Sequence, residues 1–435
     1  MAAEPRPGWS ARVNPGPVRI AIIGLGGYAR AHHLAVRDLE RTGEARLVAT
    51  CDPCPRQGEA ARAELDLAGR GVPVFTHHRE LLGFPDLDLV VVPTPIALHA
   101  EMHRDAVRAG VPVYLEKPPT LDPREFARML AVERTARRAT WVGFNFAAEP
   151  TRLALKRRLL AGEFGPLHEV RVEAAWPRHP SYFTRNPWAG RLRDAGGALV
   201  LDSCLGNALA HYVHNGLQWA GGPGVAHWAR PRAVQAAFFR AHRIETTDTV
   251  LVASRLEGGA RLRLAFTHAC AGESAHAETL RCARATIRYV TGAGVTIRWR
   301  DGHVESPPLE PFDPLRDNHR ACYAWLRGDR PRPATTLEDA SAFLELHTLA
   351  FISAREVDLL PAAAIGTDPG GLLQVAGLEP AMRAFLDNER WPLAWMPRGV
   401  PASAEPGADL PERLDATIDR LRAAAGAGAG SPPPG

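Results

Sequence analysis

The sequence predicts a doubly wound, parallel α/β domain followed by an α+β domain with a large, mainly antiparallel open sheet. Three observations lead to this prediction. An apolar run at 18–23 ends in a glycine-rich turn, and a helical pattern starts after Tyr28. Strands and helices then alternate up to residue 146, which is typical of a parallel sheet with helical crossovers. Beyond this point several strands follow one another, separated by short turns that contain glycine.

The first domain is expected at 18–145. The chain of 435 residues is too long for one ordinary core, and its character changes near residue 146. Residues 88–92 are a nearly continuous apolar run, as expected for a strand that is buried on both faces. The predicted strands lie at 18–23, 47–51, 72–75, 88–92, 111–115 and 141–146, and the predicted helices at 30–41, 56–68, 97–109 and 123–138.

The second domain is expected at 146–357, with helices on one face of its sheet. The predicted strands lie at 168–176, 249–256, 260–268, 285–290 and 295–300, and the predicted helices at 151–161, 196–219, 316–326 and 337–357. Residues 358–400 are expected to form an extension packed on the domains. The Ala/Gly/Pro-rich residues 401–435 are predicted to be a largely disordered tail with one isolated helix at 411–425, and residues 1–17 a flexible leader.

The glycine-rich turn has the order strand, turn and helix that binds a dinucleotide in a Rossmann domain. Gly24 makes the turn, and Gly26 lets a pyrophosphate approach the backbone. Ala29 still allows the helix to pack close to the strand, and the unpaired N–H groups at the helix start, after Gly27 and Tyr28, attract the anion. The alternative is an ordinary α/β turn without a ligand.

Asp52 follows the second strand and is expected to accept the hydroxyl groups of an adenosine ribose. The expected cofactor is NAD(H) or NADP(H). A 2′-phosphate would meet the like charge of Asp52, and Arg56 would partly neutralise that charge, so a modest preference for NAD is predicted.

Other candidates follow the later strands, whose carboxyl ends face the ligand in such sheets. Glu116 and Lys117 follow the fifth strand, and Lys117 is the leading acid/base candidate because a positive nicotinamide favours its neutral form. The alternative is a surface lysine paired with Glu116. Thr94, Pro95, His99 and Asn145 are expected to face the same crevice, although His99 would also suit local packing.

These motifs, in this order and spacing, resemble the glucose-fructose oxidoreductase / inositol dehydrogenase / MocA (Gfo/Idh/MocA) family over roughly residues 18–355. The most specific element is Glu116-Lys117-Pro118. The resemblance implies hydride transfer between a nicotinamide cofactor and a hydroxyl or carbonyl carbon of a sugar, cyclitol or related polyol. It also implies that Lys117 serves in catalysis.

The second domain departs from the family pattern of an aspartate followed four residues later by a histidine. Asp202 matches, but Gly206 stands at the histidine position. Asn207, His211 and Asn215 are spaced four apart and are predicted to share a helical face. His211 and Asp202 are candidate catalytic helpers, which requires Asp202 to precede or cap the helix, since nine residues of ideal helix would place them on opposite sides.

The segment 176–193 is predicted to be a long loop over the cleft. Its Tyr182, Arg185 and Trp188 suit a sugar ring or an anionic substituent, and Asn207 is a further substrate-binding candidate. The alternative is a loop buried at a subunit contact.

Two other functions remain open because of Gly206. One is an NAD-dependent glycosidase that cleaves by transient oxidation and elimination, and the other is a non-catalytic dinucleotide-binding sensor or partner protein. A homodimer or homotetramer through the C-terminal sheet is expected.

Composition bears on the expected location and ligands of the protein. The formal net charge of +4 and the lack of a basic stripe give no argument for nucleic acid. The sequence contains no run of eighteen apolar residues, so no membrane span is predicted. The leader at 1–17 lacks the apolar region of a signal peptide, so a cytoplasmic location is expected. Cys51 and Cys54 lack a second ligand pair, so no metal site is predicted.

Overall fold

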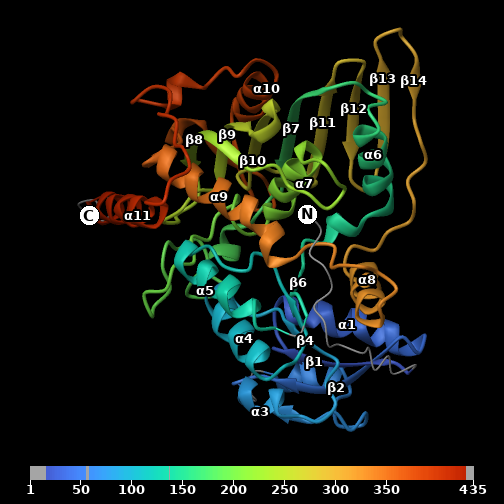
Figure 1. Ribbon diagram of the computed structural model, residues 1–435. Coiled ribbons are helices and arrows are strands. Elements are labelled where there is room, and N and C mark those ends of the chain that lie inside the picture. The colour runs from blue at the N-terminus through green and yellow to red at the C-terminus, as the bar shows by residue number, and fades with distance from the viewer. Residues whose placement is uncertain (1–15, 55–57, 137, 428–435) are drawn as a thin grey trace. The chain divides into compact units, whose positions relative to one another are not determined.

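The computed structural model describes residues 16–54, 58–136 and 138–427, with side chains up to residue 424 (Figure 1). Contacts divide the chain into two compact units. The first consists of the residues up to Thr120, Glu125–Glu149 and Phe312–Glu338, and the second of Leu121–Arg124, Pro150–Pro311 and the residues from Asp339 onward. Residues 312–338 therefore pack in the first unit, although the sequence places them in the second domain. The expected leader at 1–17 lies almost wholly outside the described residues.

The first unit contains the predicted parallel sheet, with strand order β3-β2-β1-β4-β5-β6. This order reverses between β1 and β4, the position where ligands bind in doubly wound sheets. The sheet core is apolar, and Ile20, Ile22, Val90 and Val91 are all inaccessible to solvent. The strands are β1 (Val18–Ile23), β2 (Ala45–Cys51), β3 (Val74–Phe75), β4 (Leu89–Val92), β5 (Val113–Leu115) and β6 (Trp141–Val142). The helices are α1 (Tyr28–Arg41), α2 (Glu59–Glu64), α3 (His78–Leu82), α4 (Ile96–Arg108), α5 (Pro123–Glu133) and α8 (Arg316–Arg327).

The second unit contains a nine-stranded sheet of order β14-β13-β12-β11-β7-β10-β9-β8-β15. It is mainly antiparallel, with parallel pairs only at β7–β10 and β8–β15, so the predicted fold class is confirmed. The strands are β7 (Leu167–Ala175), β8 (Pro231–Arg240), β9 (Thr249–Leu256), β10 (Arg261–Thr267), β11 (Ala275–Cys282), β12 (Ala285–Val290), β13 (Gly294–Trp299), β14 (Val304–Glu305) and β15 (Val357–Leu359). A small hairpin of β16 (Ile365–Thr367) and β17 (Leu373–Val375) follows, and the helices are α6 (Pro150–Leu160), α7 (Ala210–Ala220), α9 (Leu337–Ala354), α10 (Leu378–Asn388) and α11 (Leu410–Ala427).

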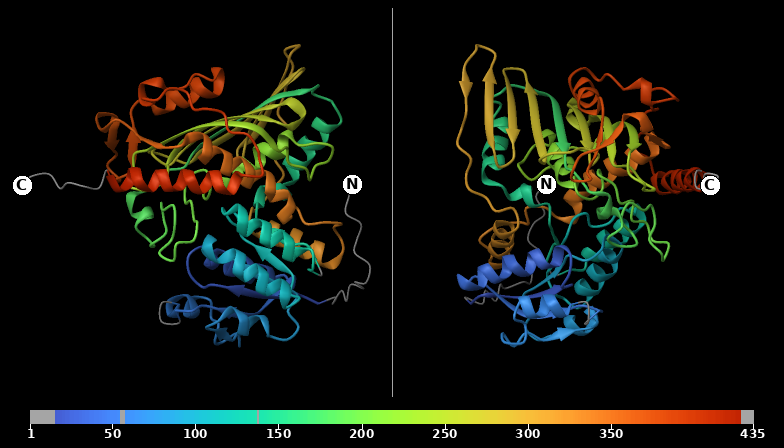
Figure 2. Two further views of the ribbon diagram at one scale, coloured as in Figure 1. Left: turned by 60° about the vertical axis from the view of Figure 1, so that its left-hand side comes forward. Right: turned by 180° about the vertical axis from the view of Figure 1, so that it is seen from behind.

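Helices cover both faces of this second sheet, not one face as the sequence predicts (Figure 2). On one face α7 approaches closely at Gly216, where a Cβ would lie 2.9 Å from Leu262 Cδ1 and 3.2 Å from Val172 Cγ2. The opposite face of β8–β10 is covered by the extension that contains α10. Together they form a buried core of Ala237, Phe239, Leu251, Ala253, Ala265, Ala269, Leu360, Val375, Leu378, Met382, Phe385, Leu386 and Met396.

The C-terminal tail is more ordered than its composition predicts. Helix α11 covers the predicted 411–425, but it packs on the second unit and is not isolated, because Leu414, Ile418 and Leu421 are buried. Before it, Ala404 pairs with Val234 of β8. The apolar side chains at helical spacing, and not the surrounding Ala, Gly and Pro residues, determine the structure of this segment.

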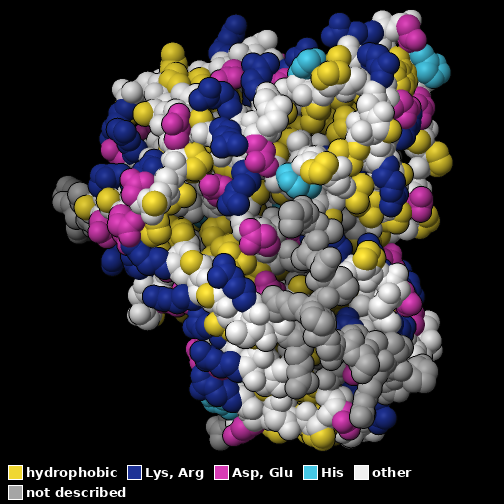
Figure 3. Space-filling model, in the orientation of Figure 1, with side chains coloured by type: hydrophobic (Ala, Val, Ile, Leu, Met, Phe, Trp, Pro, Cys, Tyr) yellow, Lys and Arg dark blue, Asp and Glu magenta, His cyan; other side chains and the backbone are white. Residues whose placement is uncertain are grey.

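Within the part of the chain that the structure describes, none of the helices is long and apolar enough to cross a membrane. On the face shown in Figure 3, basic and acidic side chains are interspersed over the surface.

Candidate dinucleotide and catalytic site

The glycine-rich turn joins β1 to α1 at the reversal of strand order. Gly24 has a φ of +108°, and a Cβ there would lie 3.2 Å from Ala29 Cβ, so only glycine allows this close approach. The Gly24 carbonyl oxygen lies 3.0 Å from His33 Nε2. This histidine is buried, which lowers its pKa to about 4, so its neutral ring holds the turn.

The start of α1 offers room for an anion beside its first backbone N–H groups, of which that of Ala29 also donates to Gly26 O at 3.1 Å. A Cβ on Gly26 or Gly27 would meet no atom within 4 Å. Gly27 is the N-cap residue, and among the described residues no side chain caps this helix and no acidic residue lies in its first turn. The open space beside the first N–H groups of the helix is compatible with a pyrophosphate, and the binding of one there stays a prediction.

Asp52 lies directly after β2, where its carboxylate touches the turn. Oδ2 accepts a hydrogen bond from Leu25 N at 3.0 Å, and Oδ1 accepts one from Cys54 N at 2.9 Å. Each oxygen keeps a further lone pair for a ribose hydroxyl. Arg56, the predicted neighbour of a 2′-phosphate, lies outside the described residues.

Thr94, Pro95 and His99 lie where the chain leaves β4, and Pro95 is the N-cap residue of α4. The ring of His99 lies between two carbonyl oxygens, with Nε2 2.8 Å from Thr94 O and Nδ1 2.9 Å from Pro118 O. The side chain is 1% exposed, and burial lowers its pKa. His99 therefore ties the loop after β4 to the loop after β5, which is the local packing role that the sequence left open.

Glu116 and half-buried Lys117 follow β5. The Glu116 carboxylate fits against Gly143, where a Cβ would stand 2.6 Å from Oε1. Its Oε2 accepts a hydrogen bond from Lys117 N at 3.1 Å, and its Oε1 lies 3.2 Å from His32 Nε2. The glycine provides the space for the carboxylate, and the two nitrogens fix its orientation.

Asn145 begins the 3₁₀-helix that follows β6 and is 3% exposed. Its Oδ1 accepts hydrogen bonds from Asn318 Nδ2 at 2.7 Å and from the Tyr114 hydroxyl at 3.4 Å. Partial desolvation and the charge of Glu116 raise the pKa of Tyr28, which is 47% exposed and whose ring packs against that of His32. The structure thus brings the predicted residues Tyr28, Glu116 and Asn145 into one polar cluster.

Asp202, in the second unit, is 3% exposed and lies in irregular backbone. Oδ1 accepts a hydrogen bond from Asn207 Nδ2 and Oδ2 accepts one from Gly190 N, both at 2.7 Å. Helix α7 begins only at Ala210, with Leu209 as its N-cap residue. Asp202 precedes the helix, so helical periodicity does not set its direction relative to His211.

The predicted polar row of Asn207, His211 and Asn215 does not share one helical face. Asn207 lies before α7, and its amide is bound to Asp202. His211 is partly buried in the first turn of the helix. Asn215 is buried and donates to Glu278 Oε1 at 2.9 Å, next to the ion pair of Glu278 with Arg152. Asn207 is therefore not part of the helical row, because α7 starts later than the spacing suggests, and only His211 and Asn215, four residues apart on α7, share a helical face.

The loop at 176–193 carries the predicted aromatic and basic side chains together. The Arg185 guanidinium lies 3.4 Å from the ring centre of Tyr182 and 5.5 Å from that of Trp188. Such stacking holds the guanidinium in place while its edge stays exposed.

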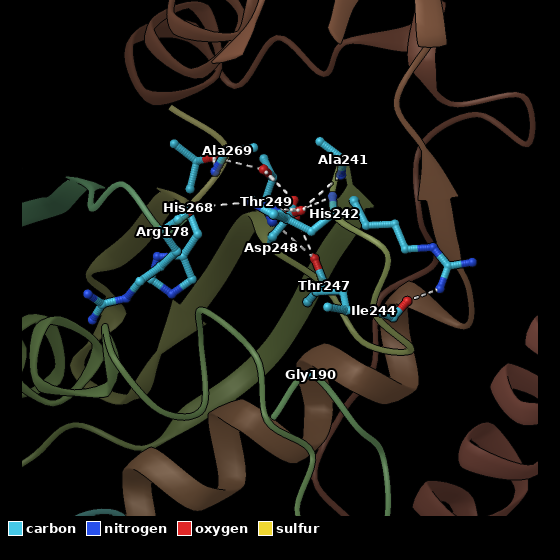
Figure 4. Close-up of polar contacts among 12 residues, drawn as sticks. Arg178, Gly190, Ala241, His242, Ile244, Thr247, Asp248, Thr249, His268 and Ala269 are labelled. Carbon is cyan, nitrogen blue, oxygen red and sulfur yellow. Dashed lines mark hydrogen bonds and ion pairs between the residues drawn. The ribbon is translucent and has the colours of Figure 1, made fainter. Parts of the chain in front are cut away.

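Both ends of this loop are fixed to the sheet (Figure 4). Buried Asp248 accepts hydrogen bonds from Ala241 N at 2.9 Å and His242 N at 2.7 Å, and His242 Nδ1 lies 2.7 Å from the same oxygen. His242 Nε2 lies 3.0 Å from Arg178 O at the start of the loop. Near its end, Gly190 O accepts a hydrogen bond from the N–H group of Glu245 at 2.9 Å.

One group of described residues has the composition of a metal site. Single ligand atoms of His78, Glu101 and Asp105 all lie within 4.8 Å of one another. The Arg79 guanidinium pairs with both carboxylates, at 2.7 Å each, so a cation would have to displace it. The prediction of no metal remains a prediction.

Comparison with known proteins agrees with this geometry. Residues 18–144 match the family model described as "Oxidoreductase family, NAD-binding Rossmann fold", and residues 153–288 match the "GFO/IDH/MocA C-terminal domain". The chain belongs to the Gfo/Idh/MocA family. Both matched segments follow the layout of a parallel and a mainly antiparallel sheet described above.

Relatives of the chain include dehydrogenases and reductases. Inositol 2-dehydrogenase 4 of Saccharopolyspora erythraea is 34% identical over 149 residues, which are 34% of this chain and 42% of the relative. The dTDP-3,4-didehydro-2,6-dideoxy-alpha-D-glucose 3-reductase of Saccharopolyspora spinosa is 30% identical over 185 residues, 42% of this chain and 52% of the relative. The chain thus spans about half the length of these curated relatives. Among solved structures, the WlbA dehydrogenase of Bordetella pertussis, in complex with NADH and UDP-GlcNAcA, has 25% identity and a TM-score of 0.63, and the match covers 78% of this chain and 97% of that one.

Steric crowding explains why glycine, and not the histidine of the Gfo/Idh/MocA pattern, stands at position 206. A Cβ at Gly206 would lie 2.7 Å from Nε2 of His347, on α9, and 3.0 Å from Leu121 Cδ1. His347 has no exposed surface, and burial lowers its pKa to about 3. An imidazole from another helix therefore occupies the space next to position 206, and no side chain fits there without moving it.

Three polar residues of this Gfo/Idh/MocA chain were not predicted as site residues. Asn318, His319 and Tyr323 lie on α8, and they join the cluster around Glu116 and Asn145. The helix itself is predicted, but the sequence assigns it to the other domain. Their spacing at i, i+1 and i+5 resembles no ligand motif, so the sequence alone offers no signal for them.

Proposed function

We propose that the protein is an NAD(P)-dependent oxidoreductase that transfers a hydride between a nicotinamide cofactor and a hydroxyl or carbonyl carbon of a sugar, cyclitol or related polyol. The observation that carries the proposal is the open, uncapped start of α1 after the glycine-rich turn. It combines with Asp52 on one side and Glu116 and Lys117 at the carboxyl end of β5. Relatives named for inositol and for nucleotide-linked sugars support the substrate class.

The residues proposed to hold the cofactor surround the turn and the ends of β2, β4 and β5. When bound, the nicotinamide supplies or accepts the hydride. The pyrophosphate would lie on the N–H groups at the start of α1, and Asp52 would accept the ribose hydroxyls. The proposed set is Gly24, Gly26, Gly27, Tyr28, Ala29, Asp52, Arg56, Thr94, Pro95, His99, Glu116 and Lys117, with His99 acting through the two loops that it joins.

Lys117 is proposed as the group that takes the proton from the substrate hydroxyl during oxidation and returns it during reduction. Asp202 and His211 are proposed helpers, with Asp202 orienting Asn207 toward the substrate. Asn145, Tyr182, Arg185, Trp188 and Asn207 are the proposed substrate-binding residues. The stacked Arg185 offers an exposed edge to an anionic substituent such as a carboxylate or phosphate.

NAD is proposed to be modestly preferred over NADP, since the Asp52 carboxylate repels a 2′-phosphate. Titration of both cofactors against tryptophan fluorescence tests this proposal. Tighter binding of NADP would contradict it.

A glycosidase that uses NAD for transient oxidation is the second candidate, and Gly206 is the observation that favours it. A non-catalytic dinucleotide sensor is the third. The experiment that decides incubates the purified protein with NAD and a panel of polyols and sugars and records absorbance at 340 nm. Growth of the NADH signal supports the oxidoreductase. Release of the leaving group from an aryl glycoside without net NADH supports the glycosidase, and NAD binding without either reaction supports the sensor.

A homodimer or homotetramer through the C-terminal sheet remains our proposal, restricted to the β11–β14 part. The face of β8–β10 that packs against α10 is already covered by the extension, so the proposed contact uses the strands β11–β14. Light scattering of the intact protein tests this proposal, and a monomer at micromolar concentration would contradict it. The cytoplasm is the proposed location, which cell fractionation tests.

A further inference from the structure

A chain of hydrogen-bonded side chains leads from α8 to Glu116 within the first unit. The Tyr323 hydroxyl lies 3.2 Å from His319 Nδ1, and His319 Nε2 lies 2.9 Å from His32 Nδ1. His32 Nε2 lies 3.2 Å from Glu116 Oε1. Both histidines are fully buried, Tyr323 is 1% exposed and Glu116 is 4% exposed.

The direction of these hydrogen bonds follows from Tyr323. Within the described ranges its hydroxyl has no hydrogen-bonding partner other than His319. A buried hydroxyl that fails to donate costs free energy, so the Tyr323 O–H group donates to His319 Nδ1. The neutral ring of His319 then donates from Nε2 to His32 Nδ1, and His32 donates from Nε2 to Glu116 Oε1. Glu116 is the final acceptor, as a carboxylate.

The two residues of α8 in this hydrogen-bonded series, His319 and Tyr323, stay uncharged. Burial raises the pKa of Tyr323 well above its usual value and lowers the pKa of His319 well below its usual value. Neither a tyrosinate nor an imidazolium at position 319 is therefore populated near neutral pH. A relay that moves a proton along the chain would need one of them, so orientation of the carboxylate is the role that the chemistry allows.

The space around Glu116 is shaped for one position of its carboxylate. Gly143 leaves room for Oε1, and the Lys117 N–H group holds Oε2. The other titratable groups that interact electrostatically with the chain or with Glu116 come from several elements. Among the described residues they include Tyr28, His33, Glu40 and Glu44 on or next to α1, His99 on α4, Tyr114 on β5, Lys117, and Cys322 and Arg327 on α8.

We propose that His32, His319 and Tyr323 are positioning residues that hold Glu116 as an oriented carboxylate beside Lys117. This inference rests on the proposed function, because Lys117 is the proton-transfer group there. The neutral donors stabilise the charged form of Glu116, so the enzyme keeps its active arrangement at lower pH than it would without them.

The first test does not depend on activity. Nitrogen-15 NMR of histidine-labelled protein between pH 5.5 and 8 reports which ring nitrogen carries hydrogen. The expected result for both His32 and His319 is a neutral ring protonated at Nε2, assigned by loss of signals in single histidine variants. A ring protonated at Nδ1 alone, or at both nitrogens, would overturn the proposal.

The second test measures kcat/KM against pH for Tyr323→Phe. Without the hydroxyl, the opposite direction of the chain becomes accessible and Glu116 accepts a proton more readily. The acid limb of the profile is expected to move to higher pH, with activity at that limb lowered roughly threefold or more. His319→Leu should move the limb further, and His319→Gln, which retains a donor toward His32, should restore part of the activity.

His103→Gln is the matched control, because His103 is also a buried histidine of the first unit and is bonded to Thr140 Oγ1 at 2.9 Å. It is expected to change Tm but not the acid limb. Identical limbs in wild type and Tyr323→Phe would overturn the positioning role. If wild type turns over no polyol, the proposed function fails, and the NMR result alone then decides whether the oriented chain exists.

Discussion

The turn at 24–29, in the first unit, and the segment at 201–207, in the second unit, present their polar groups in opposite ways. The turn uses backbone N–H groups at a helix start, and its glycines provide open space. The segment at 201–207 uses side chains, and its glycine is crowded by His347. All groups of the turn at 24–29 come from a few consecutive residues, so a sequence motif describes it. The segment at 201–207 depends on residues of distant elements, so no motif describes it.

The largest expected effect is at Lys117, which follows β5 in the same unit as the turn at 24–29, and it tests whether this unit supplies the acid/base group. Lys117→Ala is expected to lower kcat about a hundredfold or more, the usual size for loss of a general acid or base. Lys117→Arg retains the charge but cannot act as a base near neutral pH, so it should lower kcat by a similar factor. Stopped-flow turnover with a polyol identified at 340 nm measures both. Near-normal turnover in either variant would remove Lys117 from the proposed proton transfer.

A smaller effect is expected from crowding the turn. Gly24→Ala combines a positive φ with a Cβ contact of 3.2 Å to Ala29, so the turn must shift away from the pyrophosphate. The Kd for NADH should rise about tenfold, or about 1.4 kcal/mol. Gly43→Ala is the matched control, with a φ of +75° and no atom within 4 Å of its Cβ. Equal cofactor affinity in the two variants would contradict the role of the close approach at Gly24.

His347, the neighbour of Gly206, is expected to make the free energy of unfolding depend on pH. Its pKa of about 3 in the folded state lies below the ordinary value near 6.5, so its neutral burial stabilises the protein above pH 6.5. This stability is lost as the pH falls from about 6.5 toward 3, by up to about 1.4 kcal/mol per pH unit. His347→Leu should reduce this acid sensitivity in urea unfolding. The same slope for wild type and variant would contradict the buried, neutral state.

The smallest expected effect is the energetic coupling between substitutions at Gly206 and His347. Gly206→Ala should lower the free energy of unfolding by about 1–3 kcal/mol, because its Cβ overlaps the His347 ring. With His347→Ala in the background, the same substitution should cost at least about 0.5 kcal/mol less. Urea unfolding of the four proteins in this cycle measures the coupling. Additive costs would mean that Leu121 and not His347 limits the space.

What the sequence predicts well depends on local chemistry. The parallel sheet, the turn at Gly24 and the placement of Asp52 and Glu116 after their strands all follow from neighbouring residues. Strands β8 and β11 are missed, because alanines and polar residues replace the β-branched runs that mark strands.

The remaining differences come from tertiary contacts. His347, which occupies the space next to Gly206, is on α9, and the hydrogen-bond partners of Asn145 and His32 are on α8. In each case the two residues are more than a hundred positions apart in the sequence. Helix α11 was expected to be isolated because its buried face, including Leu414 and Ile418, is visible only against the unit on which it packs. Spacing within a segment carries no information about such partners.

The place of α8 in the first unit has a consequence for biosynthesis. Asn318 and His319 bond to Asn145 and His32, so the N-terminal unit lacks these polar partners until more than three hundred residues have been synthesised. A ribosome adds about 5–20 residues per second, so the Asn145 amide and the His32 imidazole lack their partners on α8 for many seconds. The first part to leave the ribosome is therefore completed late, and a fragment that ends at residue 150 would retain the same unpaired groups.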